Sequence, residues 1–137
     1  MPRFVDTNIL LYSIAGHPTD KTKCRRAVEI LKNRDLALST QVLQEFYVQA
    51  TRPTRADAIS HEVAIGFIKV WKRFPVQAIT MDIVNSALDI CGRHRLSYWD
   101  SAIVAAAQAS GCDELLTEDL GHGQRIGSVT IINPFRA

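Results

Sequence analysis

Four carboxylates in this chain stand where they could share one chemical task. Asp6 lies inside an apolar run, residues 4–12, and the other three candidates are Glu45, Asp100 and Asp119. A charge buried among apolar side chains costs free energy unless a cation or hydrogen-bond donors face it. Asp6 therefore predicts a partner, supplied either by the rest of the chain or by a bound ion.

A shared divalent cation would suit all four acids. If the carboxylates converge, their repulsion raises their pKa values and destabilises the fold. Mg²⁺ or Mn²⁺ removes that penalty, and both ions prefer hard oxygen ligands. One such ion can activate water for attack on a phosphodiester, and a second, about 4 Å away, can stabilise the leaving oxygen. The four histidines are far apart and share no metal-ligand spacing. The residues favour a site for one or two magnesium or manganese ions.

Each acid taken singly also has a purely structural interpretation. Asp6 could cap the helix that follows it, and Asp100 could complete a capping box that Ser97 begins. Asp119 could be a turn residue, and Glu45 could lie on the surface or in an ion pair. The residues alone leave these interpretations open.

Short buried strands alternate with helices along the chain. The strands are predicted at Arg3–Thr7, Leu36–Ser39, Val76–Ile79, Leu115–Thr117 and Val129–Ile132. Amphipathic spacing predicts helices from about Ile9 to a break at Gly16, and then at Lys21–Lys32, Thr40–Thr51, Ser60–Arg73, Thr80–His94 and Tyr98–Ser110. This alternation is typical of an α/β fold with a mostly parallel central sheet covered by helices on both faces. In such sheets ligands bind at the carboxyl ends of the strands, where Asp6 and Asp119 fall.

Some of the predicted elements carry finer expectations. The residues expected to face inward from the helix Ser60–Arg73 are Val63, Phe67, Val70 and Trp71. The helix that carries Asp100 is rich in alanine, so it is expected to pack closely and centrally. The glycines at positions 121, 123 and 127 predict a mobile loop before the last strand.

Length and composition describe one folded domain over residues 1–137. The chain is 47% hydrophobic and 22% charged, with a net charge of +2, as in ordinary folded domains. No apolar run approaches the ~20 residues of a membrane span, and the N-terminus lacks the pattern of a secretion signal. The three cysteines form no C-x-x-C pair. This favours reduced thiols and a cytoplasmic location.

Basic residues gather in four clusters despite the small net charge. The clusters are Lys21–Arg26, Arg52 with Arg55, Lys69–Arg73, and Arg93 with Arg95. A solvated helix face explains any one of them. Several clusters around an acidic centre could instead hold a phosphate backbone.

The four acids lie in four short motifs that span nearly the whole chain. The motifs are residues 4–10 (FVDTNIL), 38–46 (LSTQVLQEF), 99–107 (WDSAIVAAA) and 116–120 (LTEDL). Each is weak alone, but all four occur in order in one domain. Together they resemble the motifs of PIN-domain nucleases, and within these the VapC-like toxins of prokaryotic toxin–antitoxin pairs.

The resemblance implies a PIN-like fold and a magnesium- or manganese-dependent endoribonuclease. Asp6 and Asp100 would be the principal direct metal ligands. Glu45 and Asp119 would complete the cage or bind through waters, and one of them would position the attacking water.

The resemblance also points to supporting residues. Asn8 and Ser39 match polar positions that support the site in this family. Glu118 is ambiguous, because it lies beside the matching acid and could substitute for it. Asp119 is preferred because it matches the motif.

Proteins of this kind form homodimers and are held inactive by a small antitoxin, whose C-terminal segment covers the acidic groove. The resemblance thus implies an RNA substrate, a second copy of the chain and an antitoxin partner. The helices at Lys21–Lys32 and Ser60–Arg73 carry apolar residues that are candidates for exposure, such as Ile30, Phe67 and Trp71. They are where a partner helix is expected, although plain core packing explains these residues equally well.

Rival functions fit parts of the sequence. A phospho-acceptor receiver domain would need a lysine after a late strand, and no lysine follows Lys72. A PIN-like scaffold that binds without cutting would be favoured by the loss of an acid, and all four are present. A housekeeping RNA-processing nuclease of the PIN type stays open as an alternative.

Overall fold

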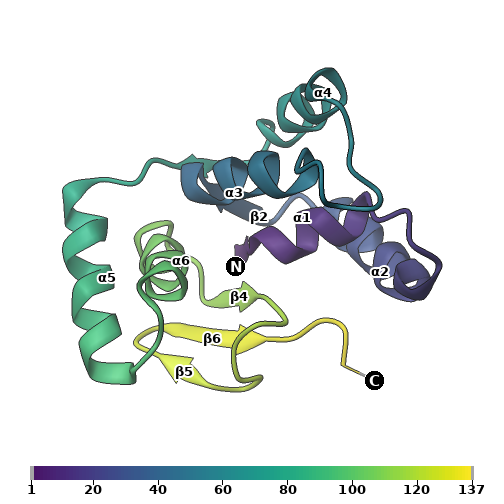
Figure 1. Ribbon diagram of the computed structural model, residues 1–137. Helices are drawn as coiled ribbons and strands as arrows, with labels where there is room; N and C mark the ends of the chain where they lie inside the picture. The colour runs from purple at the N-terminus through teal and green to yellow at the C-terminus, as the bar shows by residue number, and fades with distance from the viewer. Residues whose placement is uncertain (1, 137) are drawn as a thin grey trace.

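The centre of the protein is a six-stranded sheet with one antiparallel edge. The computed structural model describes residues 2–136. Its strands are β1 (Arg3–Val5), β2 (Leu36–Ser39), β3 (Val76–Gln77), β4 (Glu114–Leu116), β5 (Arg125–Ile126) and β6 (Val129–Ile132). The order across the sheet is β3-β2-β1-β4-β6-β5, and only the β5–β6 pair is antiparallel (Figure 1).

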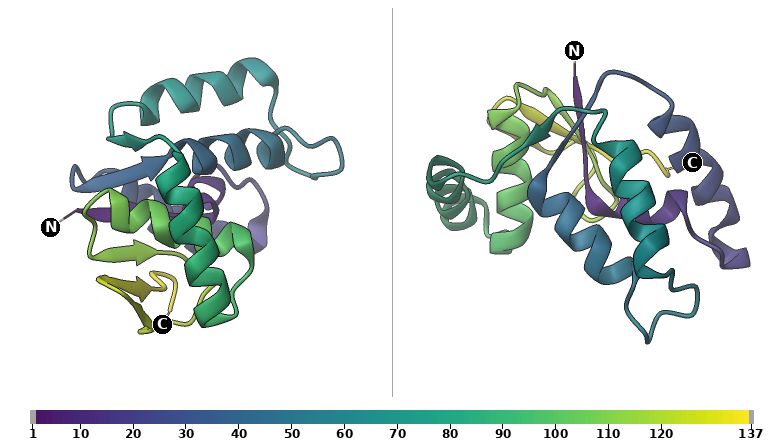
Figure 2. Two further views of the ribbon diagram at one scale, coloured as in Figure 1. Left: turned by 90° about the vertical axis from the view of Figure 1, so that its left-hand side faces the viewer. Right: turned by 90° about the horizontal axis from the view of Figure 1, so that it is seen from above.

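Six α-helices cover this sheet. They are α1 (Thr7–Ser13), α2 (Lys21–Leu31), α3 (Thr40–Ala50), α4 (His61–Trp71), α5 (Met81–His94) and α6 (Tyr98–Ala109), with a short 3-10 helix at Pro18–Asp20. Seen from above in Figure 2, α5 and α6 lie on one side of the strands and α1 to α4 on the other. The predicted α/β architecture is confirmed.

Side-chain caps decide where several helices begin. The hydroxyls of Ser39, Ser60, Thr80 and Ser97 each accept a hydrogen bond from the backbone N–H three residues further on. Such a cap satisfies a helix N–H that has no partner within the helix, and it stabilises the helix by about 1 kcal/mol. The first strand ends earlier than predicted, at Val5, because Asp6 is already the N-cap residue of α1 and its side chain accepts from the N–H of Thr7.

The alanine-rich helix α6 is the most deeply buried helix. Every residue from Ser101 to Ala107 is at most 2% exposed, and the helix packs against β2, β4 and β6. Small side chains let the helix axis approach the sheet closely, so the predicted central position is confirmed.

Part of the predicted inward face of α4 is wrong. Trp71 is buried and its ring meets Phe46 edge-on at 4.6 Å. Val63 and Val70, however, are 48% and 50% exposed. The helix buries Ala64 and Trp71, seven residues apart, and a residue one position earlier is turned by about 100° around the axis. The valines therefore lie beside the buried stripe.

The glycine-rich segment before β6 is not only a loop, contrary to expectation. Its residues Arg125 and Ile126 form β5, which returns antiparallel along β6 through a turn at Gly127. Gly127 has φ +58°, a left-handed conformation that glycine adopts without strain. The amide of Gln108 on α6 donates to the carbonyl of Ile126 at 3.1 Å. A two-residue strand is too short to show an alternating pattern in the sequence.

Two further features concern the cysteines and the lengths of the helices. Cys24, Cys91 and Cys112 are all free thiols. None of the helices within residues 2–136 is long and apolar enough to span a bilayer.

Candidate active site

The register of the parallel strands brings the residues after β1 and β4 side by side. Val5 pairs with Leu116, and the next backbone N–H, that of Asp6, donates to the Leu116 carbonyl at 3.1 Å. This register places Asp6 beside Thr117. The Thr117 hydroxyl donates to Asp6 Oδ2 at 2.8 Å. This hydrogen bond joins residues that are 111 positions apart in the sequence and lies at one side of the candidate site.

All four predicted acids line one cavity of about 120 Å³. Asp6 comes from the start of α1, Glu45 from α3, Asp100 from the first turn of α6, and Asp119 from the loop after β4. The rest of the lining is Thr7, Asn8, Leu11, Gln49, Trp99 and Ile103. The expectation that ligands bind at the carboxyl ends of the strands therefore pointed to this cavity. The helices α3 and α6 contribute its other two acids, Glu45 and Asp100.

Asp6 is the most deeply buried acid of the cavity. It is 5% exposed, and its Oδ1 accepts a hydrogen bond from the N–H of Thr7 at 2.6 Å. Burial raises the pKa of Asp6 to about 7, with further increases from the charges of Asp119 and Glu45, while the hydrogen bonds from Thr117 and Thr7 oppose the rise. No ion pair among residues 2–136 involves any of the four acids.

Glu45 is held by donors from two helices. Its Oε1 accepts from the Thr7 hydroxyl at 2.8 Å, which joins α3 to the start of α1. Its Oε2 accepts from Gln41 Nε2 at 3.4 Å, and the same amide group donates to the carbonyl of Trp99 at 3.2 Å. Gln41 therefore ties α3 to the start of α6.

Asp100 lies one turn into a capped helix. The Ser97 hydroxyl accepts from the N–H of Asp100 at 3.1 Å, so the predicted cap is confirmed. Within the described part of the chain, no hydrogen bond runs back from the N–H of Ser97 to the Asp100 carboxylate. Burial raises the pKa of Asp100, the side-chain hydroxyl of Ser97 near the carboxyl lowers it, and the charge of Asp119 raises it further. The Asp100 carboxylate therefore takes no part in capping the helix, and Asp100 lines the cavity.

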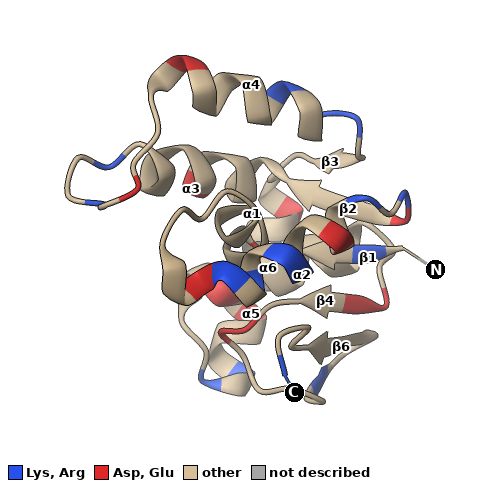
Figure 3. Cartoon of the chain, turned by 90° about the vertical axis from the view of Figure 1, so that its right-hand side faces the viewer, with Lys and Arg blue, Asp and Glu red and all other residues tan. Residues whose placement is uncertain are grey.

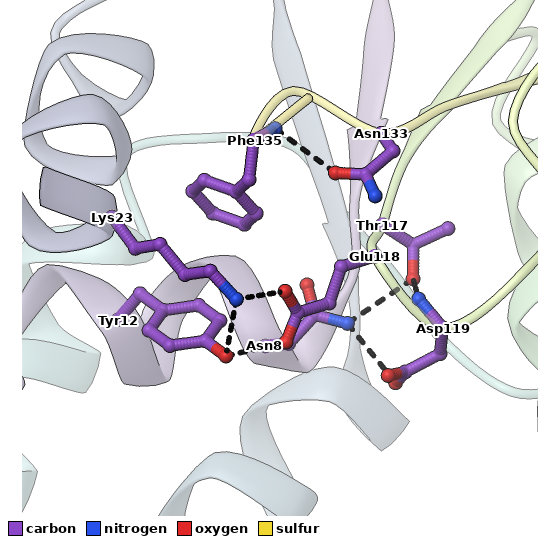
Figure 4. Close-up of polar contacts among 8 residues, drawn as sticks. All are labelled: Asn8, Tyr12, Lys23, Thr117, Glu118, Asp119, Asn133 and Phe135. Atoms are coloured by element: carbon purple, nitrogen blue, oxygen red, sulfur yellow. Dashed lines mark hydrogen bonds and ion pairs between the residues drawn. The ribbon is translucent and has the colours of Figure 1, made fainter. Parts of the chain in front are cut away.

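Asn8 connects the start of α1 to the loop after β4, as Figure 4 shows. Its Nδ2 donates to Thr117 Oγ1 at 3.1 Å and to Asp119 Oδ2 at 3.0 Å. The N–H of Asp119 donates to the same Thr117 hydroxyl at 3.1 Å. The Oδ1 of Asn8 is buried, with no hydrogen-bond partner among the described residues. The structure thus places Asn8 in direct contact with a predicted site acid.

Glu118 and Asp119 are neighbours in sequence with different surroundings. The Glu118 carboxylate pairs with Lys23 Nζ at 2.8 Å and accepts from the Tyr12 hydroxyl, and it does not line the acidic cavity. Asp119 does. The geometry therefore assigns the cavity position to Asp119.

Ser39 does not line the cavity either. It is fully buried, and its hydroxyl accepts from the N–H of Val42 at 3.3 Å. Its structural contribution is to fix the first turn of α3, the helix that presents Glu45.

The sequence interpretation did not single out the uncharged donors of the site. Thr7, Thr117 and Gln41 hold the carboxylates in place. Thr7 is next to Asp6 in the sequence, Thr117 is two positions before Asp119, and Gln41 is one helical turn before Glu45. Their positions in the sequence could have identified two of them, because Thr7 follows Asp6 and Thr117 directly follows a strand.

The residues of the cavity fit a hard divalent cation. Four of the residues that line the cavity are carboxylates, and Asp6 forms no ion pair with a cationic side chain among the residues described. Such oxygen ligands suit Mg²⁺ or Mn²⁺. Within residues 2–136, however, no three His, Cys, Asp or Glu side chains lie close enough to form a metal-binding group as they stand.

A second hollow adjoins the acidic cavity and shares Glu45, Gln49 and Trp99 with it. Its volume is about 340 Å³, and Arg52 and Val48 also line it. Trp99 is 64% exposed. On another side, the basic residues of α2 lie near the acidic loop after β4 (Figure 3).

These features define an α/β protein with an acidic site at the carboxyl ends of parallel strands. The family model of the PIN domain matches residues 3–125. The chain therefore belongs to the PIN domain family, and the resemblance seen in its motifs is confirmed.

Several solved structures share the fold, among them one toxin–antitoxin complex. A complex from Klebsiella pneumoniae is 22% identical, with a TM-score of 0.73, and the match covers 98% of this chain and 99% of that chain. FitAcB from Neisseria gonorrhoeae is 17% identical, with a TM-score of 0.68 over 98% and 99%. VapC20 of Mycobacterium tuberculosis, a toxin that cleaves the sarcin–ricin loop, is 22% identical, with a TM-score of 0.63 over 82% and 86%. At this identity the likeness shows the fold. No curated protein matches the sequence.

Proposed function

We propose that this protein is a magnesium- or manganese-dependent endoribonuclease and the toxin of a toxin–antitoxin pair. The observation that carries the proposal is that the acids of all four motifs, Asp6, Glu45, Asp100 and Asp119, line one cavity. Membership of the PIN family supports a nuclease. The similar structures include a toxin that cleaves RNA and a toxin–antitoxin complex, which supports the toxin role.

In this proposal Asp6 and Asp100 would hold the metal directly. Glu45 and Asp119 would complete the cage or act through water. When bound, the metal supplies activation of water and neutralisation of charge on the phosphodiester.

The chain's own residues prepare the carboxylates for this task. Thr117 and Thr7 donate to Asp6, and Asn8 donates to Asp119, so each acid is held in one orientation before any ligand arrives. Because the pKa of Asp6 is about 7, its carboxyl gives up a proton when the site is loaded near neutral pH.

The hollow beside Trp99 suits the substrate strand. An exposed indole can stack on an unpaired base, and a guanidinium such as that of Arg52 can pair with a phosphate. Both residues line the hollow that continues from the acidic cavity. The substrate is therefore proposed to be single-stranded or loop RNA.

The partners are proposed from the surface and the relatives. A groove of about 270 Å³ between α2 and α4 is lined by apolar side chains, among them Val28, Phe67 and the half-exposed Val70. An amphipathic antitoxin helix would bury such a face. A homodimer and a cytoplasmic location complete the proposal.

Cleavage assays on two variants test the catalytic assignment. Asp6→Asn and Asp100→Asn are expected to lose RNA cleavage in Mg²⁺ or Mn²⁺ by at least about 100-fold, since each removes a metal ligand. Asp82→Asn, which changes an exposed acid on α5, is the matched control and should cut normally. If both site variants cut as well as the parent, the proposed site is wrong.

Expression in cells tests the toxin assignment separately. Growth arrest that depends on Asp6 and is relieved by a co-expressed small partner protein is the expected result. Cleavage in the test tube without growth arrest would favour a housekeeping RNA-processing nuclease. RNA binding without cleavage would favour a scaffold.

A further inference from the structure

Two helices, α1 and α2, each send one side chain to the Glu118 carboxylate. Lys23 on α2 places its Nζ 2.8 Å from Glu118 Oε2, and Tyr12 on α1 donates its hydroxyl to Glu118 Oε1. Lys23 Nζ also donates to the Tyr12 hydroxyl at 3.3 Å. Figure 4 shows this cluster on the side of the loop opposite Asp119.

Aromatic rings shelter the ion pair. Lys23 Nζ lies 4.9 Å from the centre of the Tyr12 ring and 5.7 Å from that of Phe135. The two rings meet edge-on at 5.0 Å, and the N–H of Phe135 donates to Asn133 Oδ1 at 2.9 Å. The side chains of Glu118 and Lys23 are 22% and 41% exposed, so the rings shield the pair only in part. A pair that is partly shielded from water and backed by rings resists screening better than an open surface pair.

The loop from Thr117 to Asp119 is held at every side chain. Thr117 donates to Asp6, Glu118 is held by Lys23 and Tyr12, and Asp119 accepts from Asn8. Three consecutive side chains are thus held by different partners. Because the two residues are adjacent, a shift of the Glu118 backbone also moves the backbone of Asp119.

We propose that Lys23 and Tyr12 are positioning residues for Asp119: by anchoring Glu118 on the outer side of the loop, they hold the Asp119 carboxylate in the acidic cavity. This inference rests on the proposed metal-dependent function. It makes Glu118 an anchor for the loop, with Asp119 alone of the two acids facing the metal.

Charge-changing variants distinguish positioning from simple electrostatics. Lys23→Met removes a positive charge near the cavity and Glu118→Gln removes a negative one. If only long-range charge matters, the first variant strengthens Mn²⁺ binding and the second weakens it. If the anchor positions Asp119, both weaken it. Tyr12→Phe removes one hydrogen bond and no charge, so it should weaken binding as well.

The measurement is a Mn²⁺ titration of the full chain, followed by the electron paramagnetic resonance of free Mn²⁺. The expected weakening is about 3- to 10-fold for each variant, below the 10- to 100-fold typical of groups that contact a metal ligand directly. Lys32→Met is the matched control, because Lys32 pairs with Glu29 at 3.0 Å at the far end of α2 and lies outside the cluster. The control should bind Mn²⁺ like the parent.

Hydrogen exchange of the metal-free protein provides a second readout. The N–H of Asp119 should exchange about 5-fold faster in the Lys23→Met and Tyr12→Phe variants, as expected from loss of a partly sheltered contact. Opposite effects of Lys23→Met and Glu118→Gln on Mn²⁺ affinity, or unchanged exchange at Asp119, would overturn the inference. If the parent binds no Mn²⁺, the proposed function fails, and hydrogen exchange alone decides whether the loop is anchored.

Discussion

Replacing Asp6 by asparagine should stabilise the metal-free protein at alkaline pH. Asp6 is buried and its pKa is raised from 3.8 to about 7. Because the folded pKa lies above the ordinary value, the favoured form is the protonated one. Its contribution to stability is fully present below pH 3.8 and is lost as the pH rises to about 7. Above pH 7 the folded protein must hold a buried carboxylate.

The size of this effect follows from the two pKa values. Each pH unit between them is worth about 1.4 kcal/mol, so at pH 8 the ionised Asp6 costs the parent about 4 kcal/mol. The asparagine of the variant carries no charge, but its amide NH₂ group cannot accept one of the hydrogen bonds that Thr7 and Thr117 donate to Asp6, a loss of about 1 kcal/mol. The Asp6→Asn protein should therefore be about 3 kcal/mol more stable than the parent at pH 8, and within about 1 kcal/mol of it at pH 5.

Urea unfolding in the presence of a chelator measures the difference. The gap in unfolding free energy between variant and parent should grow by about 3 kcal/mol from pH 5 to pH 8, and this growth does not depend on the value of the lost hydrogen bond. A gap that stays constant across this range would refute the reasoning, because it would mean that Asp6 has the same pKa in the folded and unfolded protein.

Three further outcomes are expected. Mn²⁺ at 100 times its dissociation constant should raise the unfolding free energy of the parent by about 2.7 kcal/mol, and a chelator should reverse this increase. An equal increase in a double variant, Asp6→Asn with Asp100→Asn, would contradict the proposed metal site. Trp99→Ala should weaken binding of single-stranded RNA about 5- to 150-fold in fluorescence anisotropy, with Trp99→Phe closer to the parent. Equal binding by the Trp99→Ala variant, with a shift from dimer to monomer in sedimentation, would assign that surface to a second copy of the chain. Phe46→Ala should lower the unfolding free energy by about 3–5 kcal/mol in urea, because Phe46 is fully buried against Trp71. The exposed Val63→Ala should change it by at most about 0.5 kcal/mol, and similar losses in both variants would contradict this description of the core.

Local signals explain what the sequence predicted well. The bounds of β2 and β6 match the predicted strands, and α5 and α6 begin directly after their predicted caps, Thr80 and Ser97. Strand ends and capping residues are decided within a few positions of the chain. The same signals placed Asp6 and Asp100 at the starts of helices.

Contacts between distant segments explain the misses. The strand β5 exists because β6 offers a free edge, and the orientation of Val63 and Val70 depends on which face of α4 meets α3. Neither the strand nor the orientation of the valines can be predicted from a short stretch of sequence. The contacts of Thr7 with Glu45 and of Thr117 with Asp6 join residues that are 38 and 111 positions apart.

The sequence by itself determined which acids follow the strands and begin the helices, and its motifs identified the family. Only the tertiary structure decided which of the adjacent acids after β4 faces the cavity. Glu118 and Asp119 have similar chemistry and consecutive positions, so in the sequence only the match of Asp119 to the motif favoured it over Glu118. Lys23 and Tyr12 hold one, and Asn8 holds the other. Those partners come from α1 and α2, and the parallel pairing of β1 with β4 brings α1 beside the loop.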